Sequence, residues 1–334
     1  MTCNEMLNKT GNNDLVRALS NRKLLMDGAM GTMLQAKSLD ENDFRGNLFA
    51  EHNRALIGNY DLLSLTNPEI VKLIHREYLV AGAEIIKTNS FNANADSQAK
   101  YGTEDYVYRI NYAAASIARE LCDEFTAKSG KKRFVAGSIG PTWRLASREI
   151  SNSNSICDED IFKEFVEIYF EQISGLAAGG ADCFLIETVV DSVNAKAAIS
   201  AANLYNDKIE SAIPIIVSCS LTQDGKLLSG ESLSEFYEAI SNTPNLIAFG
   251  MNCGFGGKHI AAYIDELLSV NRHYSIIYPN AGIPNQNGIY TDNKEESLEI
   301  IKHCLESEDI HIIGGCCGTT PEYIRDISGI YFEK

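Results

Sequence analysis

The sequence predicts an α/β protein built as a single (β/α)8 TIM barrel, and two observations support this prediction. Eight short, continuous apolar runs alternate with longer segments of helical periodicity from Leu24 to near the end of the chain. Continuous apolarity is typical of strands that are buried on both faces, as in a parallel sheet. Regular alternation of such strands with helices favours a closed barrel. The predicted strands are 24–26, 85–86, 134–136, 184–186, 215–217, 247–249, 276–278 and 312–313.

Two of the intervening helices have clear boundaries in the sequence. Asn67 followed by Pro68 is typical of an N-cap with proline in the first turn, and Gly82 is typical of a residue that ends a helix. Apolar residues between positions 161 and 176 recur at spacings of three and four, and Gly179 follows them. These segments are the helices that the barrel requires between its strands.

The alternative fold is a doubly wound sheet, but its glycine-rich phosphate-binding fingerprint is absent from the sequence. A weaker apolar pair, Leu62-Leu63, is either a ninth strand or part of a loop. The composition shows no linker, so we expect residues 21–334 to form one domain. Residues 1–20 are expected to form an appended N-terminal arm or helix.

Length, charge and cysteine content exclude several classes of protein. A chain of 334 residues can bury one large core, and its formal charge of -16 argues against a nucleic-acid partner. The first 20 residues lack the apolar centre of a signal peptide, and no apolar run approaches the ~20 residues of a membrane-spanning helix. Nine cysteines, an odd number, fit a reducing compartment. We therefore expect a cytoplasmic protein without a membrane partner.

The most unusual residues are the adjacent Cys316 and Cys317, which follow the last predicted strand and are flanked by glycines. Successive side chains of a strand face opposite ways, so both cysteines reach one ion only from a turn. Cys253 follows the sixth predicted strand. A lone buried cysteine is usually a small apolar core residue, but three thiolates from two strand ends suit a zinc ion with an open fourth position. The cysteines interpreted as structural are Cys3, Cys122, Cys157, Cys183, Cys219 and Cys304.

Polar residues also follow other predicted strands, at the edge where barrels of this kind carry their chemistry. Asp27, before Gly28 and Ala29, is either a turn former or an amine-binding carboxylate beside backbone N–H groups that can hold a carboxylate. Glu187 ends an apolar strand, where burying an unpaired carboxylate is costly, so a solvated rim or a cationic ligand is expected there. Asn280 either turns the chain or belongs to the same rim.

In these motifs the chain resembles the homocysteine S-methyltransferase family, most closely the homocysteine-binding module of cobalamin-dependent methionine synthase. The resemblance extends from about Leu24 to Ile327. Several motifs occur in the same order, which makes the resemblance specific. They are MDGAMGT at 26–32, FRG at 44–46, KTNSF at 87–91, GPT at 140–142, IET at 186–188, NCG at 252–254, PNAG at 279–282 and GGCCGTTP at 314–321.

The resemblance implies that Cys253, Cys316 and Cys317 hold a catalytic zinc ion. The vacant fourth position of the ion would take the thiol of homocysteine. In the absence of substrate, Asn280 is expected to fill that position.

The resemblance also implies how the rest of homocysteine is bound. The carboxylates of Asp27 and Glu187 are expected to hold its amino group, and the backbone amides of Gly28 and Ala29 are expected to receive its carboxylate. One residue departs from the family pattern, because Lys87 stands where relatives often carry an acidic or apolar residue before Thr-Asn.

The expected reaction is attack of a zinc-activated homocysteine thiolate on a methyl donor, which forms methionine. The resemblance favours a corrinoid-borne methyl group, with methylcobalamin supplied by a corrinoid protein or by further modules such as a methyltetrahydrofolate-binding one. The alternatives are S-methylmethionine or another sulfonium donor and, in a different class, a non-catalytic module that binds homocysteine or zinc.

Overall fold

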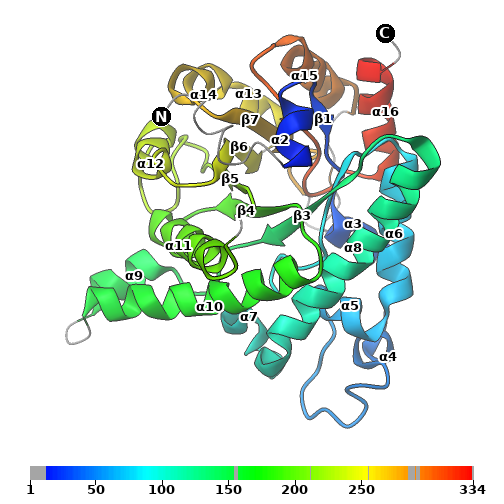
Figure 1. Ribbon diagram of the computed structural model, residues 1–334, viewed down its shortest axis with the longest axis vertical. Coiled ribbons are helices and arrows are strands. Elements are labelled where there is room, and N and C mark those ends of the chain that lie inside the picture. Colours follow the sequence, from blue (N-terminus) through cyan, green and yellow to red (C-terminus); the bar gives the residue numbers. More distant parts are fainter. Residues whose placement is uncertain are drawn as a thin grey trace.

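The computed structural model describes residues 13–153, 157–210, 212–254, 256–284, 290 and 294–332. Eight parallel strands form one sheet in the order β1-β8-β7-β6-β5-β4-β3-β2, and a parallel bridge between Met26 and Ile85 joins its two outer strands (Figure 1). The barrel predicted from the sequence is therefore confirmed. The strands are β1 (Leu24–Leu25), β2 (Ile85–Lys87), β3 (Phe134–Ile139), β4 (Cys183–Val189), β5 (Ile215–Cys219), β6 (Leu246–Cys253), β7 (Tyr274–Pro279) and β8 (Ile312–Ile313).

All eight predicted strands are present, whereas the weak pair Leu62-Leu63 is helical. Leu62 ends the 3-10 helix η1 (Tyr60–Leu62), and Leu63 begins α5 (Leu63–Thr66). Both side chains are fully buried in the core between the sheet and the surrounding helices. Their apolarity therefore reflects helix packing and not a ninth strand.

Helices surround the sheet on its outer side (Figure 1). Within the described residues, none of them has both the length and the hydropathy of a membrane span. Besides α5 they are α2 (Asp14–Leu19), α3 (Met30–Gln35), α4 (Glu41–Arg45), α6 (Pro68–Val80), α7 (Ala95–Gln98), η2 (Glu104–Tyr106), α8 (Val107–Ser129), α9 (Ala146–Asn152), α10 (Asp158–Ala178), α11 (Ser192–Lys208), α12 (Leu233–Ile240), α13 (Gly257–Ala261), α14 (Ile264–Val270), α15 (Lys294–Glu306) and α16 (Pro321–Phe332).

The helix boundaries expected from proline and glycine are confirmed. Helix α6 begins with Pro68 and ends two residues before Gly82, whose φ of 110° favours glycine. Asn67 stands at the N-cap position, but its side chain makes no capping hydrogen bond. Helix α10 ends at Ala178, and Gly179 is its C-cap residue.

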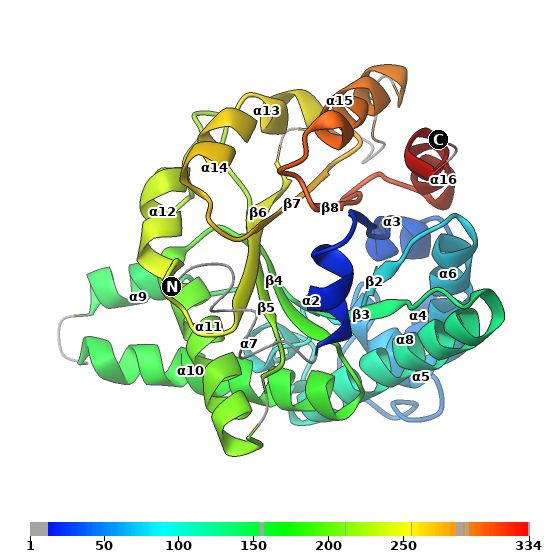
Figure 2. The same ribbon diagram turned by 45° about the horizontal axis from the view of Figure 1, so that its top comes forward.

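The barrel interior holds its own apolar cluster, distinct from the larger core between sheet and helices. Alternate strand residues such as Phe134 and Ala136 point into this interior cluster. Leu15, Val16 and Leu19 of α2 join the same cluster and are almost completely buried, and Figure 2 shows α2 lying across the strands. Part of the predicted N-terminal arm thus packs into the barrel, while the domain boundary at residue 20 stays a prediction.

The close approach of two strands generates a stability prediction at Gly250. A Cβ atom added to Gly250 in β6 would lie 1.8 Å from the carbonyl oxygen of Ile276 in β7, and a backbone atom cannot move aside locally. We expect Gly250→Ala to lower the free energy of unfolding by about 3 kcal/mol, the upper part of the range for overpacked cores. Urea denaturation followed by circular dichroism measures the effect.

The matched control is Gly31→Ala in α3, because an added Cβ at Gly31 meets no heavy atom within 4 Å. This control is expected to keep the wild-type denaturation midpoint or to raise it slightly, because alanine favours a helix more than glycine does. Equal midpoints for the Gly250 and Gly31 variants would show that β6 and β7 separate without cost.

Candidate metal centre and substrate pocket

The three cysteines predicted from the sequence form one cluster. Cys253 is the last residue of β6, and Cys316 and Cys317 lie in the turn after β8. Their three Sγ atoms all lie within 4.8 Å of one another. Thiolates at about 2.3 Å from a tetrahedral zinc ion lie about 3.8 Å apart, so the cluster has the dimensions of a three-cysteine zinc site.

Backbone hydrogen bonds fix the turn that carries the cysteine pair. The Cys316 N–H donates to the Pro279 carbonyl at 2.8 Å, and the Ala281 N–H donates to the Cys317 carbonyl at 2.9 Å. Gly318 has a φ of 80°, which favours glycine and lets the chain turn directly after the pair. The turn after β8 is therefore tied to the end of β7, and both adjacent cysteines can face one ion.

Two non-glycine residues beside the cluster have positive φ angles, 61° at Cys253 and 56° at Thr188. This conformation is rare for a β-branched residue such as Thr188. The Asn252 side chain stabilises it, because its Oδ1 accepts from the Thr188 N–H at 2.9 Å and its Nδ2 donates to Thr188 Oγ1 at 2.8 Å. The same Nδ2 lies 3.7 Å from the Cys316 sulfur. Asn252 thus links the strained ends of β4 and β6 to the metal-ligand candidates.

The pKa values of the Cys316 and Cys317 thiols are shifted in opposite directions. Hydrogen bonds to Cys253 and Cys317, together with burial, raise the pKa of the Cys316 thiol well above its usual value. Hydrogen bonds from Cys253 and Cys316 lower the pKa of Cys317. Such a cluster needs a cation before all three sulfurs can be thiolates.

Asn280 lies beside the cluster with a free acceptor atom. Its Nδ2 donates to the Gly254 carbonyl at 2.8 Å, whereas its buried Oδ1 has no hydrogen-bond partner among the described residues. An orphaned buried oxygen next to three sulfurs fits a fourth position that Asn280 or a ligand can occupy. The donor set is therefore compatible with a zinc ion.

Glu187 is buried and both of its oxygens are held. The Ser138 hydroxyl donates to Oε1 at 2.5 Å, and the Tyr278 hydroxyl donates to Oε2 at 3.1 Å. Burial raises the pKa of Glu187, while the Lys87 ammonium and these hydrogen bonds oppose the rise. The sequence prediction of a solvated rim is not confirmed, because Glu187 is only 4% exposed and is held by other side chains.

Asp27 has a cationic partner within the chain. The Lys87 Nζ lies 2.8 Å from Asp27 Oδ1, and the Lys87 backbone N–H donates to Asp27 Oδ2 at 3.0 Å. Burial works against the ammonium of Lys87, but the charges of Asp27 and Glu187 raise its pKa overall. Asp27, Glu187 and Lys87 therefore form one charged group inside the barrel, within electrostatic range of Cys316.

The backbone at Gly28 and Ala29 passes close to the turn that carries the cysteines. A Cβ at Gly28 would lie 2.7 Å from Thr319 Oγ1, so only glycine fits without a shift. The Ala29 N–H donates a long bond of 3.4 Å to the Thr319 carbonyl. The Gly28 N–H has no hydrogen-bond acceptor in the described part of the chain. That the amides of Gly28 and Ala29 bind the substrate carboxylate stays a prediction.

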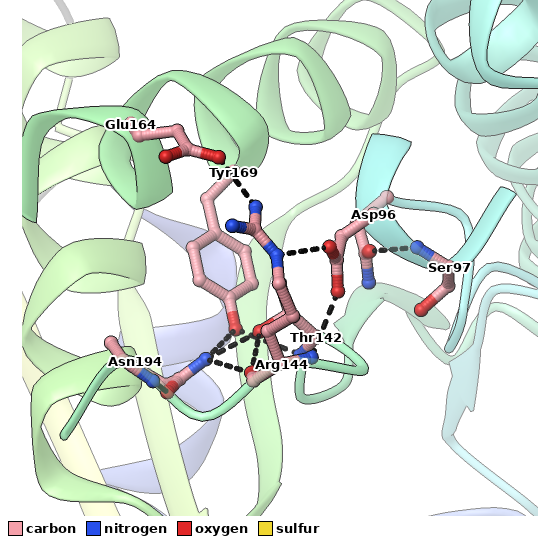
Figure 3. Close-up of polar contacts among 9 residues, drawn as sticks. Asp96, Ser97, Thr142, Arg144, Glu164, Tyr169 and Asn194 are labelled. Atoms are coloured by element: carbon pink, nitrogen blue, oxygen red, sulfur yellow. Dashed lines mark hydrogen bonds and ion pairs between the residues drawn. The ribbon is translucent and has the colours of Figure 1, made fainter. Parts of the chain in front are cut away.

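Polar contacts of Thr142 and Arg144 hold the loop that contains the Gly-Pro-Thr motif at 140–142 (Figure 3). The Thr142 N–H donates to the Tyr169 hydroxyl at 3.2 Å, and Asn194 Nδ2 donates to Thr142 Oγ1 at 2.5 Å. Arg144 contacts Asp96 of α7 at 2.7 Å and Glu164 of α10 at 2.5 Å. The loop after β3 is thereby fixed to α7, α10 and α11, which stabilises the pocket wall next to Glu187.

Ser138, Ser218 and Tyr278 were not predicted as pocket residues, because they lie at inward positions within their strands and not after the strand ends. Residues two positions beyond the apolar interior cluster continue the same inward face, because a strand repeats every two residues. On five strands this next residue is polar. They are Lys87, Ser138, Glu187, Ser218 and Tyr278. Counting every second residue along each predicted strand identifies Ser138 and Tyr278, the hydrogen-bond partners of Glu187.

Burial supports the structural interpretation for four of the remaining cysteines, whereas the fifth described one is exposed. Cys122, Cys183, Cys219 and Cys304 are buried, and Cys157 is exposed. Cys3 lies outside the described residues. None of the described ones joins a metal-binding group.

Comparisons with known proteins show the family and support the fold. The family model described as homocysteine S-methyltransferase matches residues 24–330. The metallated form of the homocysteine methyltransferase MmuM from Escherichia coli is similar at 23% identity and a TM-score of 0.72, covering 96% of this chain and 99% of that one. Its oxidized form is similar at 22% identity and a TM-score of 0.73, covering 95% and 99%. These structures support the fold, and the family match spans most of the sequence. The chain belongs to the homocysteine S-methyltransferase family and is a methyltransferase.

Proposed function

We propose that this methyltransferase forms methionine by moving a methyl group from a small sulfonium donor, such as S-methylmethionine, to homocysteine at a zinc ion. The cluster of Cys253, Cys316 and Cys317 supports the proposal most directly. A free thiol has a pKa of about 8.5 and is mostly protonated at neutral pH. A zinc ion held by these cysteines would replace the proton of the homocysteine thiol and keep the sulfur nucleophilic.

The residues of the chain orient the amino acid. The buried carboxylate of Glu187 and the Asp27–Lys87 pair lie on the inner wall, and the Gly28 amide is the candidate group for the substrate carboxylate. Binding homocysteine by its amino and carboxylate groups positions its sulfur for attack on the methyl group of the donor. The strained positions Thr188 and Cys253 keep the pocket side chains in place.

The reaction needs no side-chain base once the thiol proton has left. The homocysteine sulfur forms a bond to the methyl carbon, and the bond between that carbon and the donor sulfur breaks. The bonding electrons stay on the donor sulfur, which changes from a sulfonium cation to a neutral thioether. Both products of the reaction with S-methylmethionine are methionine.

Two considerations favour a sulfonium donor over the corrinoid-borne methyl group that the sequence analysis expected. The formal charges of Asp27, Glu187 and Lys87 sum to -1, which favours a cationic donor. The match to the E. coli homocysteine methyltransferase MmuM covers 99% of the chain of that protein, so a barrel without further modules is enough for a homocysteine methyltransferase. The comparisons give no corresponding support to a corrinoid partner. Membership of a methyltransferase family also argues against a non-catalytic binding module.

The donor is tested by offering S-methylmethionine, methylcobalamin and methyltetrahydrofolate in parallel to the zinc-loaded protein with homocysteine. We expect methionine only with S-methylmethionine, at two methionines for each homocysteine consumed, because donor and acceptor both become methionine. Chromatography with quantification of both amino acids measures this ratio. Methionine formed with methylcobalamin but not with S-methylmethionine would show that the methyl donor is corrinoid-borne.

The metal centre is tested by Cys316→Ala. Two thiolates bind zinc less tightly than three. We therefore expect the zinc content to fall below about a tenth of the wild-type content and turnover to fall at least about a hundredfold. Elemental analysis and the methionine assay on the same sample measure both. Cys157→Ala is the matched control, because Cys157 is exposed and outside the cluster. Full turnover in a zinc-free Cys316 variant would contradict the mechanism.

A further inference from the structure

Lys87 is an unusual residue for a pocket expected to bind an amino group, because it places an ammonium group there. Its side chain is 11% exposed, and the Nζ lies 2.8 Å from Asp27 Oδ1. The same Nζ donates to the carbonyls of Asp27 and Gly315, both at 3.3 Å. It also lies 5.2 Å from the centre of the Tyr278 ring. The ammonium is therefore a fixed part of the pocket, with partners from the segment after β1, from β7 and from the turn after β8.

The partners of Lys87 and Glu187 differ in a way that matters for a substrate. Lys87 supplies Asp27 with both a charge partner and a backbone N–H donor. Glu187 receives hydrogen bonds from the neutral hydroxyls of Ser138 and Tyr278, and among the described residues no cationic side chain forms an ion pair with it. Lys87 acts on Glu187 only at longer range. Glu187 is thus the carboxylate whose negative charge is still available to a bound cation.

We propose that Lys87 is a specificity-determining residue that occupies Asp27, so that Glu187 alone recognises the amino group of the thiol substrate. This inference rests on the proposed function and deepens it. A pocket with two available carboxylates would strongly reject a thiol that lacks the amino group. A pocket with one available carboxylate rejects it less, because only one charge-assisted hydrogen bond is lost.

The inference is tested by comparing homocysteine with 4-mercaptobutanoate, which lacks the amino group, and with 3-mercaptopropylamine, which lacks the carboxylate. Their dissociation constants are measured by calorimetry on zinc-loaded wild-type protein and on Lys87→Met. We expect the preference for homocysteine over 4-mercaptobutanoate to rise at least tenfold in Lys87→Met, because Asp27 is then released to the substrate. In turnover, the change is expected in KM for homocysteine and not in kcat.

Lys163→Met is the matched control, because Lys163 is an exposed helix residue that pairs with Glu159 one turn away and lies outside the pocket. Its preference ratio is expected to equal that of the wild type. An unchanged or lower ratio in Lys87→Met would overturn the inference. So would weaker binding of both carboxylate-containing thiols with unchanged binding of 3-mercaptopropylamine, because Lys87 would then bind the substrate carboxylate.

A second variant keeps the test decisive if Lys87→Met does not fold. In Glu187→Gln the amino group loses its only available carboxylate, so homocysteine is expected to bind no more tightly than 4-mercaptobutanoate. A retained preference would overturn the inference. Failure of the proposed function has a different signature, because the wild-type protein would then form no methionine from homocysteine and S-methylmethionine, whatever the thiol-binding preferences of the variants.

Discussion

The ion pair between Lys87 and Asp27 is the interaction on which the pocket depends, because it lies at the least continuous part of the barrel. Strands β1 and β8 have only two residues each, and one bridge between Met26 and Ile85 joins β1 to β2. Lys87 contacts Asp27 through its ammonium and its backbone N–H, while the Gly315 N–H donates to the Asp27 carbonyl at 3.1 Å. Removing one partner of a buried pair costs about 3–5 kcal/mol. The pair therefore joins three segments: the residues after β1, strand β2, and the turn after β8 that carries Cys316 and Cys317.

The change from an apolar to a polar interior explains why the site lies where it does. The inward residues near the start of the strands are apolar and pack with α2, which covers one end of the barrel. The next inward layer contains Lys87, Ser138, Glu187 and Tyr278, which satisfy one another through hydrogen bonds and charge. Burying polar groups is tolerable only when they are paired in this way. One end of the barrel thus supplies stability, and the other supplies a preorganised polar pocket.

The sequence was sufficient to predict the eight strands and the three clustered cysteines, because both depend on local patterns. Strand burial shows as apolar runs, and adjacent cysteines after a strand have few structural explanations. The sequence could not show that Lys87 pairs with Asp27, since that contact joins residues 60 positions apart through side-chain geometry. It also could not show that α2 packs into the barrel or that Leu62 is helical. Those outcomes depend on which surface each apolar residue meets.

The charges of the pocket constrain what it can bind in a way that no single residue does. Three thiolates and a divalent ion would carry a net charge of -1, and Asp27, Glu187 and Lys87 add another -1. Without Lys87 the buried charge would be more negative, and a bound cation such as the substrate ammonium would be needed to offset the burial of both carboxylates. Lys87 lowers the electrostatic cost of keeping Glu187 ionised, but it does so by occupying Asp27. Lys87 therefore favours the ionised form of Glu187 and, because it pairs with Asp27, makes Asp27 unavailable to the substrate.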